Sequence, residues 1–110
     1  MIVQPIAFFG VPPAPTLDPL TAVDSTTLSA SFSRDEPFDN YEVQLYLDEA
    51  LTIFANGAGP SNIGSSVNNF NTTVGDLSPG TQYWGRARVS ADGGITQSAW
   101  SNTDTGTTDA

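Results

Sequence analysis

The sequence predicts an all-β fold, a single two-layered β-sandwich. Three observations indicate it. Apolar and polar residues alternate along short segments, which is the period of a half-buried strand. Clusters of Gly, Pro, Asn and Asp separate these segments at short, regular spacing. No segment shows the 3.6-residue period of an amphipathic helix. A length of 110 residues fits one domain with one ordinary core.

Two segments alternate most clearly. In the first, residues 26–33, one face is apolar and the other carries Thr and Ser; the apolar residues are Leu28, Ala30 and Phe32. In the second, residues 41–48, we expect Tyr41, Val43, Leu45 and Leu47 to point inward and Glu42, Gln44, Tyr46 and Asp48 to point outward. These segments predict the two central strands.

The other elements follow from composition. In chain order we expect a proline-led entry at 12–15, a strand carrying Leu17, Leu20 and Val23, a loop at 35–40, a short edge strand at 51–54, a loosely structured Gly/Asn/Ser connection at 56–69, a strand at 70–77, the longest strand at 81–91, a hairpin-type turn at 92–94 and a closing strand within 95–108. About seven strands fit a sandwich better than any helical architecture.

Composition excludes several kinds of site. The chain has no Cys, no His and no Lys, so Ser-His-Asp triads, Cys-His pairs, Schiff-base lysines and nearly all zinc sites are ruled out. Twelve acidic residues against three Arg give a net charge of −9, which disfavours nucleic acid and anionic membranes as partners. We therefore expect no enzyme, no catalytic residue, no cofactor and no metal, and other protein chains as partners.

Two acidic motifs have an alternative reading. Asp104-Thr105-Gly106 spells the aspartic-protease triplet, but that chemistry needs two such Asp residues in a buried site, and the triplet lies in a polar C-terminal segment. Asp35, Glu36 and Asp39 could collect Ca²⁺, although their spacing is not that of an EF-hand loop. A solvated acidic loop is the simpler interpretation.

One segment is similar to a known family. Leu77-Ser78-Pro79-Gly80-Thr81-Gln82-Tyr83 resembles the Leu, Pro-Gly-Thr, Tyr pattern of fibronectin type III modules. The resemblance implies a tyrosine corner at Tyr83, after the turn at Pro79 and Gly80. Tyr41-x-Val43, Pro12 to Pro15 and Ser98 to Ser101 extend it over residues 12–108. It implies an immunoglobulin-like, seven-stranded Greek-key sandwich in which Phe32 replaces the family's core Trp.

A face of aromatic and arginine residues is predicted on the long strand. Period two places Trp84, Arg86 and Arg88 on one outward face, and Trp100 on the closing strand can share it. Class I cytokine receptor modules carry a similar ladder with a Trp-Ser-x-Trp-Ser motif, of which this chain keeps only the second half, with Gln97 in place of the first Trp. Either the residues form a structural Trp–Arg ladder with Glu42 pairing an Arg, or Tyr46, Trp84 and the arginines bind another protein.

The N-terminal arm, residues 1–11, is the segment least accounted for by the resemblance. It is apolar and lacks the basic start of a signal peptide, so a complete natural chain is not expected to use the general secretory route. Its interface candidates are Ile2, Val3, Ile6, Phe8 and Phe9. The arm either docks on another chain, including another copy in a homo-oligomer, or folds back over its own domain. Residues 12–108 form the domain and 109–110 a tail.

These features suggest a structural role. The leading hypothesis is a virion structural component of a tailed bacteriophage, a head decoration or tail protein that binds capsid or tail proteins and is located in the virion. One alternative is a spacer or binding module of a bacterial extracellular enzyme, secreted as part of a larger protein. A third is an adhesion or receptor-binding domain that uses Trp84 and Tyr46. The fold alone does not choose among them.

Overall fold

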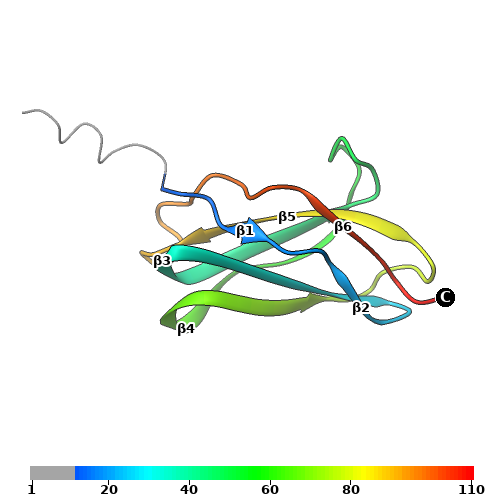
Figure 1. Cartoon of the computed structure of the whole chain (residues 1–110), viewed down its shortest axis with the longest axis horizontal. Helices are drawn as coiled ribbons and strands as arrows, with labels where there is room; N and C mark the ends of the chain where they lie inside the picture. The colour runs from blue at the N-terminus through cyan, green and yellow to red at the C-terminus, as the bar shows by residue number, and fades with distance from the viewer. Residues whose placement is uncertain (1–11) are drawn as a thin grey trace, which may run out of the picture.

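The structure is a computed structural model that describes residues 12–110, and it confirms the all-β prediction. Six strands form: β1 (Thr16–Leu17), β2 (Thr21–Asp24), β3 (Thr27–Tyr46), β4 (Phe54–Val74), β5 (Gln82–Ser90) and β6 (Asp104–Thr107) (Figure 1). All strand pairs are antiparallel. Within residues 12–110 there is no helix, and hence none that could span a membrane.

Two strands bend and supply both layers of the sandwich. The first half of β3 pairs with β1, β2 and the end of β4, whereas its second half pairs with β5 and the start of β4. β5 in turn pairs with β6. Counting β1 with β2 as one edge and each half of β3 and β4 separately gives the seven segments of a Greek-key sandwich.

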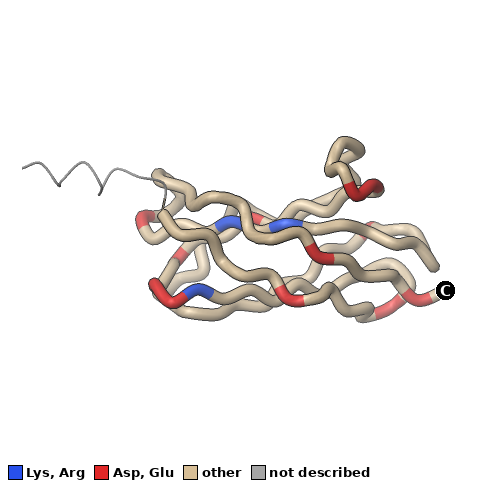
Figure 2. The backbone as a smooth tube through the Cα atoms, turned by 45° about the horizontal axis from the view of Figure 1, so that its top comes forward, with Lys and Arg blue, Asp and Glu red and all other residues tan. Residues whose placement is uncertain are grey.

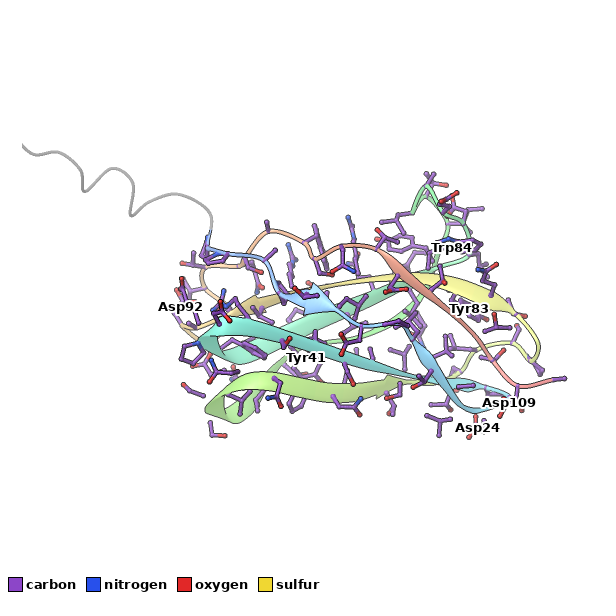
Figure 3. All side chains as sticks on the ribbon, in the orientation of Figure 1. Asp24, Tyr41, Tyr83, Trp84, Asp92 and Asp109 are labelled. Carbon is purple, nitrogen blue, oxygen red and sulfur yellow. The ribbon has the colours of Figure 1, made fainter. Side chains whose placement is uncertain are left out.

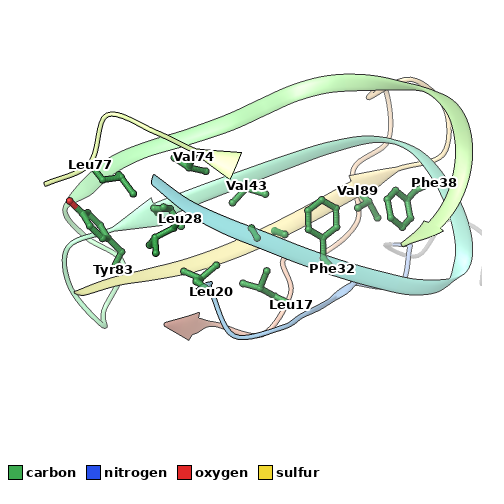
Figure 4. Packing of buried hydrophobic residues seen from close by; sticks show 13 residues of the cluster. Leu17, Leu20, Leu28, Phe32, Phe38, Val43, Val74, Leu77, Tyr83 and Val89 are labelled. Carbon is green, nitrogen blue, oxygen red and sulfur yellow. The ribbon is translucent and has the colours of Figure 1, made fainter. Parts of the chain in front are cut away.

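The core lies between the two layers (Figure 4). Phe32 is 1% exposed and its ring centroid lies 5.9 Å from that of Phe38, 6.0 Å from Tyr41 and 6.1 Å from Phe70. Aromatic pairs at these separations contribute beyond the area they bury. Phe32 is thus packed among three other aromatic rings at the centre of the core.

The predicted loop at 35–40 is wrong. These residues continue β3 through its bend, and Phe38 within them is fully buried. The bend is held by Arg34, which donates hydrogen bonds to the backbone carbonyls of Pro13, Glu36 and Pro37 at 2.9, 2.9 and 3.0 Å. Polar composition predicted a loop because it does not reveal that one buried cation satisfies several backbone groups.

The loosely structured connection predicted at 56–69 is also wrong. The segment forms most of β4 and pairs with β3, for example Ala58 with Val43 and Asn69 with Ser33. Register shifts interrupt the pairing between these points. Gly57 must stay without a side chain, because a Cβ there would lie 2.5 Å from the carbonyl oxygen of Val43. Gly57 and Gly59, two of the glycines that suggested a loop, permit close strand approach instead.

The first strands close one side of the sandwich. The Leu20 N–H donates to the Thr105 carbonyl at 3.0 Å, and the Asn102 side chain exchanges two hydrogen bonds of 2.9 Å with the backbone of Leu17. These bonds link β1 and β2 to the β6 edge and cover it. The described chain starts at one end of the long axis and finishes at the other (Figure 1). The predicted arm, with Ile2, Val3, Ile6, Phe8 and Phe9, lies outside the described residues.

Candidate functional site

The predicted aromatic–arginine face forms on the outer surface of β3 and β5. The register places Glu42 opposite Arg88, Gln44 opposite Arg86 and Tyr46 opposite Trp84. Directly opposed residues of antiparallel strands have neighbouring side chains on the same face. Residues far apart in sequence thus make one surface, which is called the ladder below: Glu42, Gln44, Tyr46, Arg86, Arg88 and Trp100.

Trp100 is the centre of the ladder. Arg86 lies 4.1 Å and Arg88 4.4 Å from the centroid of its ring, measured from the guanidinium carbon. Arg86 also lies 5.4 Å from the centroid of Tyr46. Each such contact is attractive because the ring face carries partial negative charge, and it is worth about 0.5–2 kcal/mol. The two arginines are therefore held in place on aromatic rings.

Hydrogen bonds hold the same guanidinium groups in place. The Arg88 guanidinium donates to the Glu42 carboxylate at 2.7 and 2.9 Å, and these side chains are only 31% and 12% exposed. Arg86 donates to the Gln44 side-chain oxygen at 3.1 Å and to the Tyr46 hydroxyl at 3.0 Å. These bonds and the aromatic contacts hold both guanidinium groups against the sheet, while Arg86 Nε is buried without a hydrogen-bond partner among residues 12–110.

The closing segment that carries Trp100 binds to β5 through serine hydroxyl groups as well as through its backbone. The Ser98 hydroxyl accepts from the Val89 N–H at 3.0 Å, and the Ser101 hydroxyl accepts from the Ala87 N–H at 2.9 Å. The same serines donate their own N–H groups to the Val89 and Ala87 carbonyls. Both serines are buried. The half motif Ser98-Ala99-Trp100-Ser101 therefore attaches to β5 through serine side chains and presents its Trp outward.

Two interface candidates differ from expectation. Tyr46 is on the outward face but is only 7% exposed, because Arg86 and the Phe54 ring, 5.7 Å away, cover it. Trp84 is half-buried, and within residues 12–110 it has no cation stacked on its ring. Arg86, Arg88 and Trp100 are half-buried by their mutual contacts. Figure 3 places Trp84 at the end of the sheet where the β3–β4 hairpin protrudes.

The tyrosine corner is present in geometry. Tyr83 is 2% exposed, and its hydroxyl accepts a hydrogen bond of 2.8 Å from the Ser78 N–H, just before the Pro79-Gly80 turn. Gly80 has a φ of +58°, a left-handed conformation that favours glycine. The corner ties the turn to the core, which is a structural task.

The acidic motifs do not assemble a reactive site. Among residues 12–110, no group of three or more acidic side chains is placed to hold a metal ion. The Asp39 carboxylate accepts from the Gly93 N–H at 3.1 Å and does not form a common site with Asp35 and Glu36. Asp104 lies in β6, where its carboxylate accepts from the Thr105 N–H at 2.8 Å.

The F–G turn, residues 91–96 between β5 and the closing segment, is capped by a carboxylate. Asp92 accepts from the Ser90 hydroxyl at 2.6 Å and from the Thr96 N–H at 2.8 Å. These donors lower the pKa of Asp92 to about 2, the hydroxyl having the larger effect. The cap is therefore ionised at neutral pH and stabilises the turn.

The sequence interpretation missed an exposed apolar cluster. Leu47, which was expected to point inward, is 44% exposed, and Ile53 and Phe54 are 55% and 56% exposed. Alternation failed here because β3 ends at Tyr46 and the chain turns away from the core. Neighbouring acidic residues and a Thr were the only sequence signal of that turn.

Solved structures share this fold. A Fn3-like protein from Clostridium thermocellum superimposes with a TM-score of 0.67 at 16% identity, covering 92% of this chain and 97% of that one. FN3tt gives 0.59 at 22% identity, covering 92% and 98%. The FN1–FN3 domains of chicken CNTN1 give 0.59 at 16% identity, covering 91% and 33%.

The other two comparisons found nothing: no family model matches the sequence, and no curated protein does. The structural likeness therefore carries the assignment, together with the seven antiparallel segments, the Tyr83 corner and the core around Phe32. The chain has the fold of a fibronectin type III domain.

Proposed function

We propose that the chain is a non-catalytic module that binds another protein. The observation that carries this proposal is the rigid face of β3 and β5, where Trp84 and the ladder place aromatic and arginine side chains on one side of the sheet. Trp, Tyr and Arg are the residues that most often dominate binding energy at protein interfaces. A preformed face also binds with less loss of conformational entropy.

Trp84 is the residue on this face that is free to serve a partner. The ladder residues are already engaged with one another, whereas Trp84 is half-buried and has no stacked cation among residues 12–110. Substitution Trp84→Ala should weaken partner binding about tenfold or more while the domain stays folded. Unchanged binding by a folded Trp84→Ala variant would remove this face from the interface.

The finer proposal is a structural component of a tailed-phage particle, a head decoration or tail protein located in the virion. A small acidic domain next to an uncharged apolar segment, residues 1–11, fits a protein that attaches to a larger assembly. Capsid or tail proteins would be the partners, with residues 1–11 as one contact. A sandwich of this size also forms nearly the whole chain of the Clostridium thermocellum protein and of FN3tt.

Particle purification tests the finer proposal. Particles from the source would be separated on a density gradient, and each fraction would be searched for this chain by mass spectrometry. The chain should sediment with capsid or tail proteins, and deletion of residues 1–11 should move it to the soluble fractions. If the chain is absent from intact particles, the virion role is excluded, and the coarser proposal of a protein-binding module still stands.

A spacer within a larger extracellular bacterial protein is the second candidate. One observation favours it: the described chain starts and finishes at opposite ends of the long axis, as a module in a row requires (Figure 1). The CNTN1 structure, of which this chain covers 33%, contains three such domains by its name. Sequencing the gene on both sides decides between the candidates, because a spacer needs a reading frame that continues into further domains.

A further inference from the structure

The hairpin between β3 and β4 protrudes from the sandwich and has an apolar tip. The hairpin tip is defined here as Leu47, Ile53 and Phe54, which are 44%, 55% and 56% exposed. The other large exposed apolar residues of the described chain, Val23 and Ile95, stand singly on β2 and on the F–G turn. Single exposed apolar residues are ordinary, whereas adjacent ones mark interaction sites.

The hairpin tip is held in one conformation. The Asp48 carboxylate accepts from the N–H groups of Thr52 and Ile53, each at 2.9 Å, and also from the Thr52 hydroxyl. The Leu47 N–H donates to the Ile53 carbonyl at 2.9 Å. Leu51 has a φ of +58°, a backbone conformation that residues other than glycine rarely adopt. A loop whose backbone is fixed in this way loses less backbone conformational entropy on binding.

The charge around the tip is negative. Asp48 and Glu49 belong to the hairpin, and Figure 2 shows acidic residues on it and no basic one. The hydrogen bonds from Thr52 and Ile53 lower the pKa of Asp48, so this carboxylate is charged at neutral pH. An apolar centre with an anionic border is complementary to an apolar depression with a cationic border.

This chain is poorly suited to supply that cationic border to a second copy of itself. Its three basic residues are all engaged: Arg34 is buried against backbone carbonyls, and Arg86 and Arg88 are stacked on Trp100. Two copies, each with a net charge of −9, would bring carboxylates together at this border. Residues 1–11 contain no basic side chain either. Charge therefore selects a partner of different sequence.

We propose that the hairpin tip docks into an apolar depression bordered by Lys or Arg on a protein of different sequence. The proposal rests on the function as a binding module and adds the surface and the chemistry of the partner. Ile53 and Phe54 enter the depression, and Asp48 and Glu49 face the basic border. Binding at this end of the sheet leaves the F–G turn, at the opposite end of β5, free.

A displayed library of randomised peptides serves as the probe. The full-length chain is the bait, and selected peptides are measured against the chain and against Ile53→Ser, Phe54→Ser and Ile95→Ser variants. Selected peptides should combine Lys or Arg with large apolar residues. Ile53→Ser and Phe54→Ser should each raise Kd about tenfold or more, and binding should weaken with salt. Ile95→Ser is the matched control, the same substitution at the opposite end, and should leave Kd unchanged.

Three outcomes would overturn the proposal. Peptides that bind Ile53→Ser and Phe54→Ser as well as the unchanged chain would place the site elsewhere; if Trp84→Ala then removes binding, the function as a binding module stands. Selection of peptides that lack Lys and Arg would contradict the proposed basic border on the partner. Concentration-dependent self-association of the full chain that Ile53→Ser abolishes would show that a second copy occupies the tip. Light scattering on the same variants reports that last outcome.

Discussion

The ladder and the hairpin tip are neighbours on the same sheet, yet their aromatic residues have opposite surroundings. Tyr46 is 7% exposed and Phe54 is 56% exposed, although their ring centroids lie only 5.7 Å apart. Arg86 covers Tyr46, whereas no cation is stacked on Phe54 within residues 12–110. An aromatic residue on an outward face is thus a structural or a binding residue according to whether a neighbouring strand covers it.

Removing the central ring should have the largest effect on the ladder side. Trp100→Ala deletes two cation–π contacts and a half-buried indole, so the free energy of unfolding should fall by about 2–4 kcal/mol. Urea unfolding followed by circular dichroism measures it. Trp84→Ala is the matched control and should cost about 1 kcal/mol, since it deletes no stacked cation. Equal losses for the two variants would show that the ladder contributes nothing beyond burial.

A smaller loss should follow when the ion pair of the ladder is broken. Glu42→Gln removes the charge that faces Arg88 but keeps a side chain of similar shape, so the free energy of unfolding should fall by about 0.5–1.5 kcal/mol. The loss should change little at high salt, because the pair is mostly buried, Glu42 being 12% and Arg88 31% exposed, and salt screens such pairs weakly. Glu49→Gln on the exposed hairpin is the control. An equal loss of unfolding free energy in Glu49→Gln would show that the Glu42–Arg88 ion pair contributes no specific stabilisation.

The contrast between the two regions explains what could be predicted from sequence. Period two predicted the ladder strand and composition predicted the turn, since both depend on local sequence, while the resemblance of residues 77–83 to fibronectin type III modules implied the Tyr83 corner. The coverage of Tyr46 depends on Arg86 and Trp100, which are remote in sequence, so no local pattern shows it. The hairpin tip was missed for the opposite reason: alternation continues through Leu47 after β3 has ended.

Glycine and charge misled in a similar way. In the segment 56–69, Gly57 and Gly59 mark places where β4 lies too close to β3 for a side chain, because a Cβ would lie 2.5 Å from the Val43 or the Tyr41 carbonyl oxygen. In the segment 35–40, the acidic residues Asp35 and Glu36 are exposed, whereas Phe38 and Asn40 are buried. In both cases tertiary contacts decide the backbone conformation, and composition reports only the solvent-facing positions.

The two carboxylates that cap the ends of the sheet should stabilise the fold less as the pH falls. Asp48 and Asp92 both have folded pKa values below the ordinary 3.8, Asp92 at about 2. A depressed pKa contributes stability that is present above 3.8 and is lost as pH falls through the folded value. Asp48→Asn and Asp92→Asn should therefore each lower the melting temperature at pH 7. The difference from the unchanged chain should shrink below pH 3.8, for Asp92 chiefly as pH approaches 2. A difference that is independent of pH would assign the effect to packing.

The smallest effect on stability is expected at the hairpin tip itself. Ile53→Ser should change the free energy of unfolding by less than about 0.5 kcal/mol, because the side chain is 55% exposed and contributes little to the core. Ile95→Ser, at 86% exposure, should behave in the same way.

A loss above about 1 kcal/mol for Ile53→Ser alone would mean that something in the chain covers the tip in solution. Repeating both substitutions in a chain that lacks residues 1–11 identifies the cover. If the loss disappears there, the N-terminal arm lies over the tip and the docking surface is occupied from within. If Ile53→Ser is neutral in both backgrounds, the tip is exposed in the free protein. Its side chains are then available to a partner without rearrangement, whereas the Tyr46 ring in the ladder is covered by Arg86.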